Sequence, residues 1–103
     1  MKIYSTENIQ GQQYEAIGLV SGSTVQSKSF LSDFGQSLKN FVGGELRSYS
    51  DMMNKARQEA IERMIEKATD MGADAIVGVR FSTSAIMEQA AEIMVYGTAV
   101  RFV

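Results

Sequence analysis

The strongest constraint in this sequence is a long segment whose apolar residues recur at the spacing of an α-helix. The segment runs from about Ser48 to Met71, and Gly72 follows it, a residue type that commonly terminates helices. At about 100° per residue, the apolar side chains fall within roughly 120° of one another, and Ile61 and Ile65 widen this arc toward a half circle. A helix with such a face must bury it against another element. The residues of the arc are Leu46, Tyr49, Met53, Ala56, Ala60, Met64, Ala68 and Met71.

Charged residues occupy the opposite, solvent-facing side of this predicted helix, and Arg57 is the exception because it falls near the middle of the apolar arc. A guanidinium in an apolar face is costly unless it is paired. Arg57 can extend past the small neighbours Ala56 and Ala60 to solvent, pair with a carboxylate of its own chain or of a neighbouring subunit, or face a ligand anion. The wide apolar arc and the inward arginine together favour a homo-oligomer, so we expect Arg57→Glu to weaken assembly.

Four further segments have the composition of β-strands. From Tyr14 to Val25, branched residues and glycines alternate, which predicts a strand that bends at a glycine. Lys2–Ser5 is predicted to form a short strand at the beginning of the sequence. Ala73–Phe81 and Ala91–Val103 are apolar on nearly both faces, and the polar stretch Ser82–Gln89 is predicted to connect them. Because helices on one side of a sheet cover only one face, a second covering layer is expected over the other face.

A second, shorter helix is predicted from Lys28 to Val42, because its phenylalanines and leucines recur at helical spacing. The order of elements is then β, β, α, α, β, β. This order predicts an α+β domain with a mainly antiparallel sheet, packed by one short and one long helix. At 103 residues, the chain is expected to form a single domain, residues 1–103.

The glycine pair Gly43–Gly44 lies between the two predicted helices. It matches neither the GxxxxGK[ST] nor the GxGxxG pattern of phosphate-binding loops, and a helix rather than a strand precedes it. Gly43 is predicted to end the short helix, and Ser48 with Asp51 to form a capping box at the start of the long one. The free N–H groups near Arg47 and Ser48 could still hold an anion.

The composition excludes several classes of function. The net charge is -2, from ten basic and twelve acidic residues, so we expect no nucleic-acid partner and no anionic membrane surface. No apolar run approaches the ~18 residues of a membrane span, and the first residues lack the apolar stretch of a signal peptide. We expect a cytoplasmic protein.

The chain contains no cysteine and no histidine. Thiolate metal sites, cysteine nucleophiles and the commonest general base are therefore excluded. The serines lack a GxSxG context, and methionines such as Met53, Met64 and Met71 are interpreted as core residues rather than as metal ligands. No metal site and no cofactor are predicted, although a weak Mg²⁺ or Ca²⁺ site at Asp33, Glu45 or Asp51 stays open.

Several motifs give the chain a family resemblance. GLVSGSTV at Gly18–Val25, SDFGQSLKNFVGGELRSY at Ser32–Tyr49, KARQEAIERMIEKATDMGADAIVGVRF at Lys55–Phe81 and GTAV at Gly97–Val100 resemble the YbjQ family, whose members have been labelled heavy-metal-binding. The resemblance implies a dodecin-like subunit that assembles as a ring, typically a pentamer. It carries no established activity, so it implies no catalytic residue.

The chain departs from this family pattern at two places. Many members carry acidic residues in the strand after the GADAxxG motif, where this chain has Val79–Thr83, and an acidic residue after the first VSG, where this chain has Ser23. Both departures remove ligands for hard metal ions. The metal label of the family is therefore poorly matched by this sequence.

The leading functional expectation is a non-catalytic, ring-forming homo-oligomer that binds a small ligand at its subunit interfaces. A metal-binding or metal-responsive protein is the first alternative, and an enzyme that uses carboxylate, tyrosine or arginine chemistry is the second. No residue is assigned to catalysis. The candidate ligand or interface residues are Asp33, Arg47, Ser48, Tyr49, Met53 and Arg57.

Overall fold

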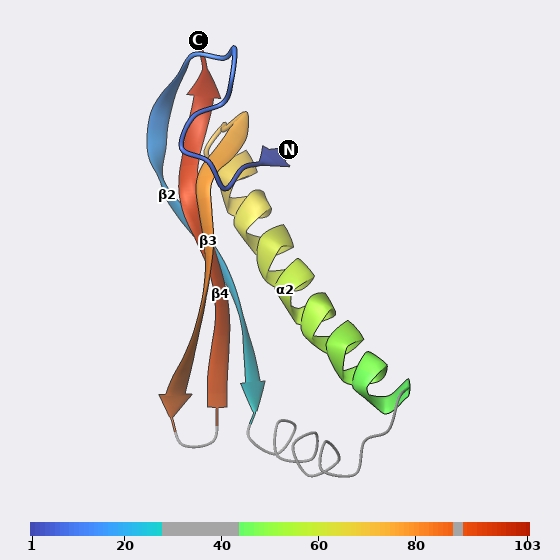
Figure 1. The fold of residues 1–103 in the computed structure, drawn as a ribbon. Coiled ribbons are helices and arrows are strands. Elements are labelled where there is room, and N and C mark those ends of the chain that lie inside the picture. The colour runs from blue at the N-terminus through green and yellow to red at the C-terminus, as the bar shows by residue number, and fades with distance from the viewer. Residues whose placement is uncertain (28–43, 88–89) are drawn as a thin grey trace.

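The computed structural model of the chain describes residues 1–27, 44–87 and 90–103 and has an α+β fold, in which one long helix lies against a four-stranded sheet (Figure 1). The predicted short helix Lys28–Val42 and the predicted helix stop at Gly43 lie outside these residues, so the full ββααββ order stays a prediction. The elements are β1 (Lys2–Ile3), β2 (Tyr14–Ser27), α2 (Gly44–Asp70), β3 (Ala75–Met87) and β4 (Ala90–Phe102).

The sheet has the strand order β1-β3-β4-β2. The long strands β2 and β3 both pair antiparallel with β4, whereas the two residues of β1 pair parallel with β3. The sheet is therefore mixed, with an antiparallel body as predicted. The register of β2 against β4 shifts between Ala16 and Gly18, and that of β3 shifts between Val77 and Arg80, where Gly78 has a φ of 63°. These irregularities bend the strands where glycines sit.

Helix α2 packs on one face of the sheet, here called the front face. Its residues Ala56, Ala60, Met64 and Ala68 are buried, which confirms the centre of the predicted apolar arc. Met71 at the end of that arc is exposed because the helix ends at Asp70. In Figure 1 the C-terminal half of α2 lies close to the sheet and its N-terminal half diverges from it.

The helix comes closest to the sheet at Gly22 on β2. A Cβ atom at this position would lie 2.1 Å from the main-chain oxygen of Ala60 and 2.5 Å from the main-chain nitrogen of Met64. Two residues along, the buried Thr24 donates a hydrogen bond from Oγ1 to the carbonyl of Ala56 at 3.5 Å. The small residues at this contact let the backbones of helix and strand approach each other.

The described residues cover the back face of the sheet over one half only. In the half near the chain termini, the buried residues Ala75, Val77 and Val100 pack against Tyr4, Ile9 and Tyr14 of the N-terminal segment. The other half, here called the distal half, comprises residues 19–27, 80–87 and 90–98. In the described chain, no second layer lies over the back face of the distal half, where Leu19 is 76% exposed and Val25 59% exposed.

Two predicted boundaries are wrong. The stretch Ser82–Gln89 was expected to be a connector, but β3 continues to Met87 because its main chain pairs with β4 as far as Ala90. Pairing with a neighbouring strand outweighs the polar composition of this stretch. The long helix begins at Gly44 rather than near Ser48, so Ser48 does not cap it. Glu45 in the first turn favours this earlier start, because a carboxylate there interacts well with the helix dipole.

The overall shape is elongated. The radius of gyration is 16.6 Å and the principal extents are 53 × 29 × 18 Å, whereas a compact domain of this length has a radius of gyration of about 13 Å. None of the described helices is long and apolar enough to cross a membrane. Strands of 13 and 14 residues extend beyond what one helix and the N-terminal segment cover.

We predict that Gly22→Ala destabilises the protein by about 1–3 kcal/mol, since the added methyl group would meet rigid main-chain atoms of α2 and force the helix away from β2. The measurement is the urea midpoint followed by circular dichroism. Gly18→Ala on the same strand is the matched control, because its Cβ would meet only Met71 Cε at 3.5 Å, an ordinary contact. Equal midpoints for the two variants would contradict the prediction.

Candidate functional site

Five of the six site residues predicted from the sequence belong to helix α2. Asp33 lies outside the described residues. Arg47, Ser48 and Tyr49 belong to the N-terminal turns of α2, where the structure describes their main chain only. Because α2 already includes Gly44, Arg47 and Ser48 lie within its helical turns. The anion site expected at the helix start stays a prediction.

Met53 and Arg57 lie one helical turn apart on α2 and are both half-buried. The Nη2 atom of Arg57 donates a hydrogen bond to Oδ1 of Asn54, a neutral group on the same helix. Among the described residues the ion pair found is Arg101 with Glu15, at 3.6 Å, and both side chains are exposed. Within that part of the chain, Arg57 therefore has a hydrogen-bond partner but no carboxylate that compensates its charge.

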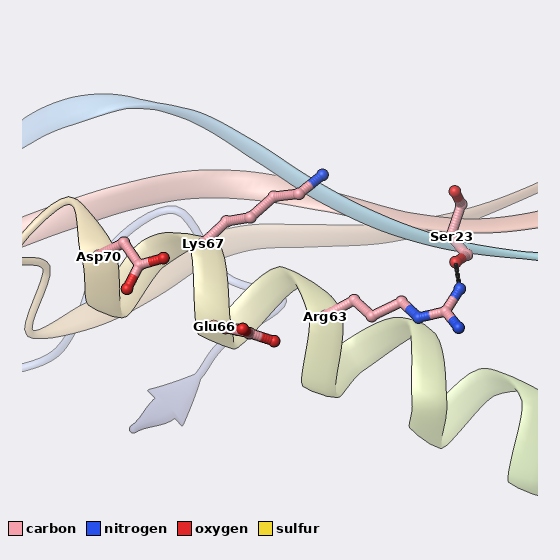
Figure 2. Close-up of a pocket in the computed structure, with 5 residues that line it drawn as sticks. All are labelled: Ser23, Arg63, Glu66, Lys67 and Asp70. Atoms are coloured by element: carbon pink, nitrogen blue, oxygen red, sulfur yellow. Dashed lines mark hydrogen bonds between the residues drawn. The ribbon is translucent and has the colours of Figure 1, made fainter.

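A first surface hollow of about 370 Å³ lies between the outer edge of β2 and the C-terminal half of α2 (Figure 2). Arg63 Nη1 donates a hydrogen bond of 2.6 Å to the main-chain carbonyl of Ser23 across it. The lining residues carry two positive and two negative charges, so the hollow is neutral overall and suits a polar ligand of mixed charge at most. They are Ser23, Arg63, Glu66, Lys67 and Asp70.

Sequence reasoning missed the contact between Arg63 and Ser23. The prediction placed Arg63 on the charged, solvent-facing side of the helix, and it is exposed as expected. Its angular position at the border of the apolar arc was the available signal, since a long side chain there can reach the strand below. The two residues are 40 positions apart, so their contact depends on how the helix crosses β2.

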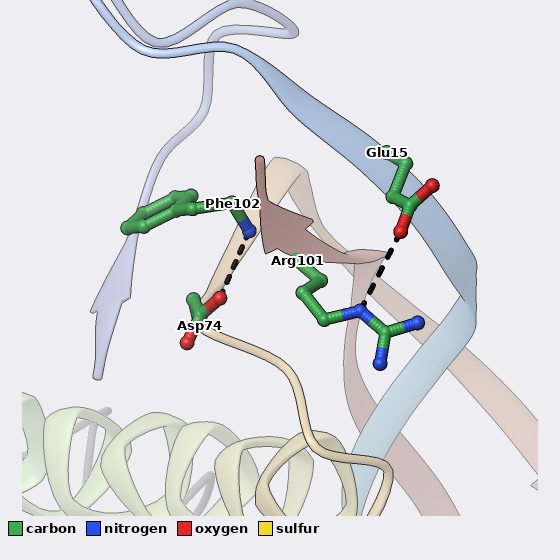
Figure 3. A network of polar contacts seen from close by, with 4 residues as sticks. All are labelled: Glu15, Asp74, Arg101 and Phe102. Atoms are coloured by element: carbon green, nitrogen blue, oxygen red, sulfur yellow. Dashed lines mark hydrogen bonds and ion pairs between the residues drawn. The ribbon is translucent and has the colours of Figure 1, made fainter.

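A second hollow of about 360 Å³ lies beneath the loop between β1 and β2. Its one acidic side chain, Asp74, is already engaged, because Oδ2 accepts a 2.8 Å hydrogen bond from the main-chain N–H of Phe102. Figure 3 shows this contact beside the exposed pair of Glu15 and Arg101. The lining is Lys2, Tyr4, Ile9, Gln10, Gly11, Gln12, Asp74 and Phe102. The bond from Phe102 to Asp74 fixes the end of the last strand.

The metal-binding capacity of the chain is limited by its donor atoms. Soft metals such as zinc, copper and cadmium prefer thiolate and imidazole ligands, and the sequence contains neither cysteine nor histidine. The described residues hold no group of three or more acidic side chains suited to a metal ion. Glu66 and Asp70 share a hollow, but Arg63 and Lys67 line it as well and would repel a cation. These residues do not fit a heavy-metal site.

Comparison with known proteins identifies the family. A family model described as "Putative heavy-metal-binding", YbjQ_1, matches residues 1–103, which is the whole chain. The chain is 54% identical over 101 residues to a UPF0145 protein of Clostridium novyi, with 98% of both chains covered. It is 50% identical over 103 residues to a UPF0145 protein of Alkaliphilus metalliredigens, with both chains covered completely.

A solved structure supports the fold. It is a crystal structure of a protein of unknown function of the DUF74 family from Pediococcus pentosaceus, with a TM-score of 0.68 and 17% sequence identity, and the match covers 100% of this chain and 98% of that one. At this identity the likeness concerns the fold alone. The match of the family model over the full length and the relatives at about 50% identity lead to one conclusion: this chain belongs to the YbjQ family of UPF0145 proteins.

Proposed function

We propose that this protein is a non-catalytic subunit of a ring-forming homo-oligomer and that the ring binds a small ligand where subunits meet. The observation that carries the proposal is the uncovered apolar surface of the distal half of the sheet. Leu19 and Val25 on β2 and Tyr96 on β4 are exposed, and Phe81 on β3 is 48% exposed on the front face beside α2. Large apolar side chains gathered on one half of a small domain indicate a protein interface.

The shape of the chain supports assembly as well. Within residues 1–27, 44–87 and 90–103, a single helix lies over the strands of the front face, and the back face is covered only near the termini. A domain of about 100 residues has little stability to spare, so leaving half of a sheet uncovered is expensive. A second copy that contacts the distal half would remove part of this surface from water.

The family resemblance supports a dodecin-like subunit and a pentameric ring, and we adopt both as part of the proposal. We also place the ring in the cytoplasm, in keeping with a sequence that has no apolar run of membrane-spanning length. The non-catalytic assignment is supported by the missing histidine and cysteine, which are the residues that most often carry proton transfer and nucleophilic attack.

The ligand, in this proposal, contacts the N-terminal half of α2. Arg57 supports this placement because it is half-buried and bonds to the neutral Asn54, so its charge is available to an anionic group. Met53 lies one turn before it, and Tyr49, Ser48 and Arg47 precede it on the same helix. An anionic or polar small molecule, or a carboxylate of the neighbouring subunit, would compensate the guanidinium.

A metal-binding role is the second candidate, because the matching family model carries that description. The lack of cysteine and histidine, and of any cluster of three acidic side chains among the described residues, argues against a site for soft metals. A weak site for Mg²⁺ or Ca²⁺ needs only oxygen ligands, and carboxylates are the available ones.

We predict that the wild-type chain is an oligomer and that Arg57→Glu weakens its assembly by about tenfold or more in dissociation constant, or about 1.4 kcal/mol or more. The reversal replaces a compensated half-buried cation by an anion at the interface. The measurement is size-exclusion chromatography with light scattering over a dilution series. Lys55→Glu is the matched control, since Lys55 is exposed on the opposite side of α2. An unchanged mass for Arg57→Glu at all concentrations would contradict the prediction.

We further predict that the purified protein binds no zinc, copper or cadmium with a dissociation constant below about 1 μM, because the chain has no thiolate or imidazole ligand. Isothermal titration with each metal, together with elemental analysis of the untreated protein, measures this. A known zinc-binding protein titrated in the same buffer is the positive control. Tight binding at a whole-number stoichiometry would favour the metal-binding candidate instead.

A further inference from the structure

The sheet has two outer strand edges that no described strand covers. β2 is the last strand of the order β1-β3-β4-β2, so its far side faces no other strand of the described chain. On the opposite side, the N-terminal segment covers β3 only as far as Arg80. Tyr4 exchanges main-chain hydrogen bonds with Ile76 and Val79, and the Arg80 side chain reaches the carbonyl of Ser5. Beyond Arg80, β3 pairs only with β4 among the described strands.

These two edges lack most of the features that usually prevent association, although the register of β3 shifts between Ala85 and Met87. Exposed edge strands normally carry charged residues or proline, which block pairing with another chain. The outer part of β2, Gly18–Ser27, and the outer part of β3, Phe81–Met87, contain no charged residue and no proline. Each edge can therefore form main-chain hydrogen bonds with a further strand.

The two edges are also level with each other and run in the same direction. Through β4, Thr24 is aligned with Ile93 and Thr83, and the same alignment holds as far as Gln26, Ala91 and Ala85. The register of β3 then shifts by one residue before Met87. Because both strands are antiparallel to β4, they are parallel to each other. Rotating one copy about an axis near the strand direction would therefore bring its β2 beside β3 of the next copy, apart from the tilt and stagger that closure of a sheet requires.

We propose that subunits join by parallel pairing of β2 of one copy with β3 of the next, so that the sheet continues around the ring. This inference rests on the proposed homo-oligomer and specifies its interface. The two edges are different surfaces, so the contact is head-to-tail, and a closed ring leaves neither edge free. A two-fold pairing of β2 with β2 would leave β3 open in both copies, so the structure favours the ring.

The Arg63 side chain lies at the edge of β2 that takes part in the proposed pairing. In the single chain its guanidinium occupies the carbonyl of Ser23, a main-chain acceptor of the edge strand. Arg63 is exposed and can swing aside when a main-chain N–H of the incoming β3 takes its place. The hollow along α2 and β2 in Figure 2 would then border the subunit contact.

Disulfide trapping tests the pairing cleanly because the natural chain has no cysteine. Val25 and Ser84 are both exposed and are aligned with Glu92 of β4, so they share the back face at one level. In the proposed interface, Val25 of one copy lies beside Ser84 of the next, within reach of a disulfide. The double variant Val25→Cys/Ser84→Cys, treated with diamide, should give a ladder of covalent oligomers up to the complete ring on a non-reducing gel.

Leu19→Cys/Ser84→Cys is the matched control. Leu19 is exposed on the same strand, six residues before Val25, about 20 Å away, and should give no ladder. Two results would overturn the strand pairing but not the oligomer. One is equal ladders for the two double variants, and the other is no ladder for either variant in a sample that light scattering shows to be oligomeric. A covalent dimer from Val25→Cys alone would indicate the two-fold arrangement instead. A monomeric wild type would overturn the oligomer itself.

Hydrogen exchange on the wild-type protein provides a second measurement that needs no substitution. The proposed pairing predicts that the amides of Gly18–Ser27 and Phe81–Met87 are protected as strongly as those of the central strand β4. Exchange of every second amide on both edges within seconds, as in an unpaired strand edge, would contradict the pairing.

Discussion

The contact of α2 with β2 at Gly22 determines where the helix lies on the sheet. Only a residue without a side chain allows the main chain of Ala60 and Met64 to approach this closely, and the alanines at positions 56, 60 and 68 keep the helix low along the contact. The helix is held over β2 and β4 as a result. Phe81 on β3 stays exposed beside it, and the distal back face has no cover in the described chain.

This placement leaves much of the sheet without a covering layer in the described part of the chain. The strands of 13 and 14 residues extend well past the region that α2 and the N-terminal segment cover. Apolar side chains and uncharged strand edges are left together on the same half of the molecule. In the proposed homo-oligomer, further copies would contact that half and bury part of it.

Much of the fold could be predicted from the sequence, because its periodic signals are local. The buried face of α2 follows from the spacing of Ala56, Ala60, Met64 and Ala68, and β2 follows from alternating residues. The extent of β3 could not be predicted in the same way, since Ser82 and Ser84 belong to a strand only because β4 pairs with them.

The candidate site was harder to predict than the fold. Met53 and Arg57 are half-buried on α2, and the bond of Arg57 to Asn54 follows the i, i+3 spacing that a sequence does reveal. The contact of Arg63 with Ser23 joins residues 40 positions apart and needs the crossing of helix and strand to be known. The description of the family as heavy-metal-binding finds no matching donor set among the described residues.

Native mass spectrometry of the wild-type protein is the most direct test of this account. Closure of the sheet into a ring predicts one dominant species, whose mass is a whole multiple of the 11.3 kDa chain, without a series of smaller open assemblies. A single species at the mass of one chain, at micromolar concentration and in a volatile buffer of near-physiological ionic strength, would contradict it.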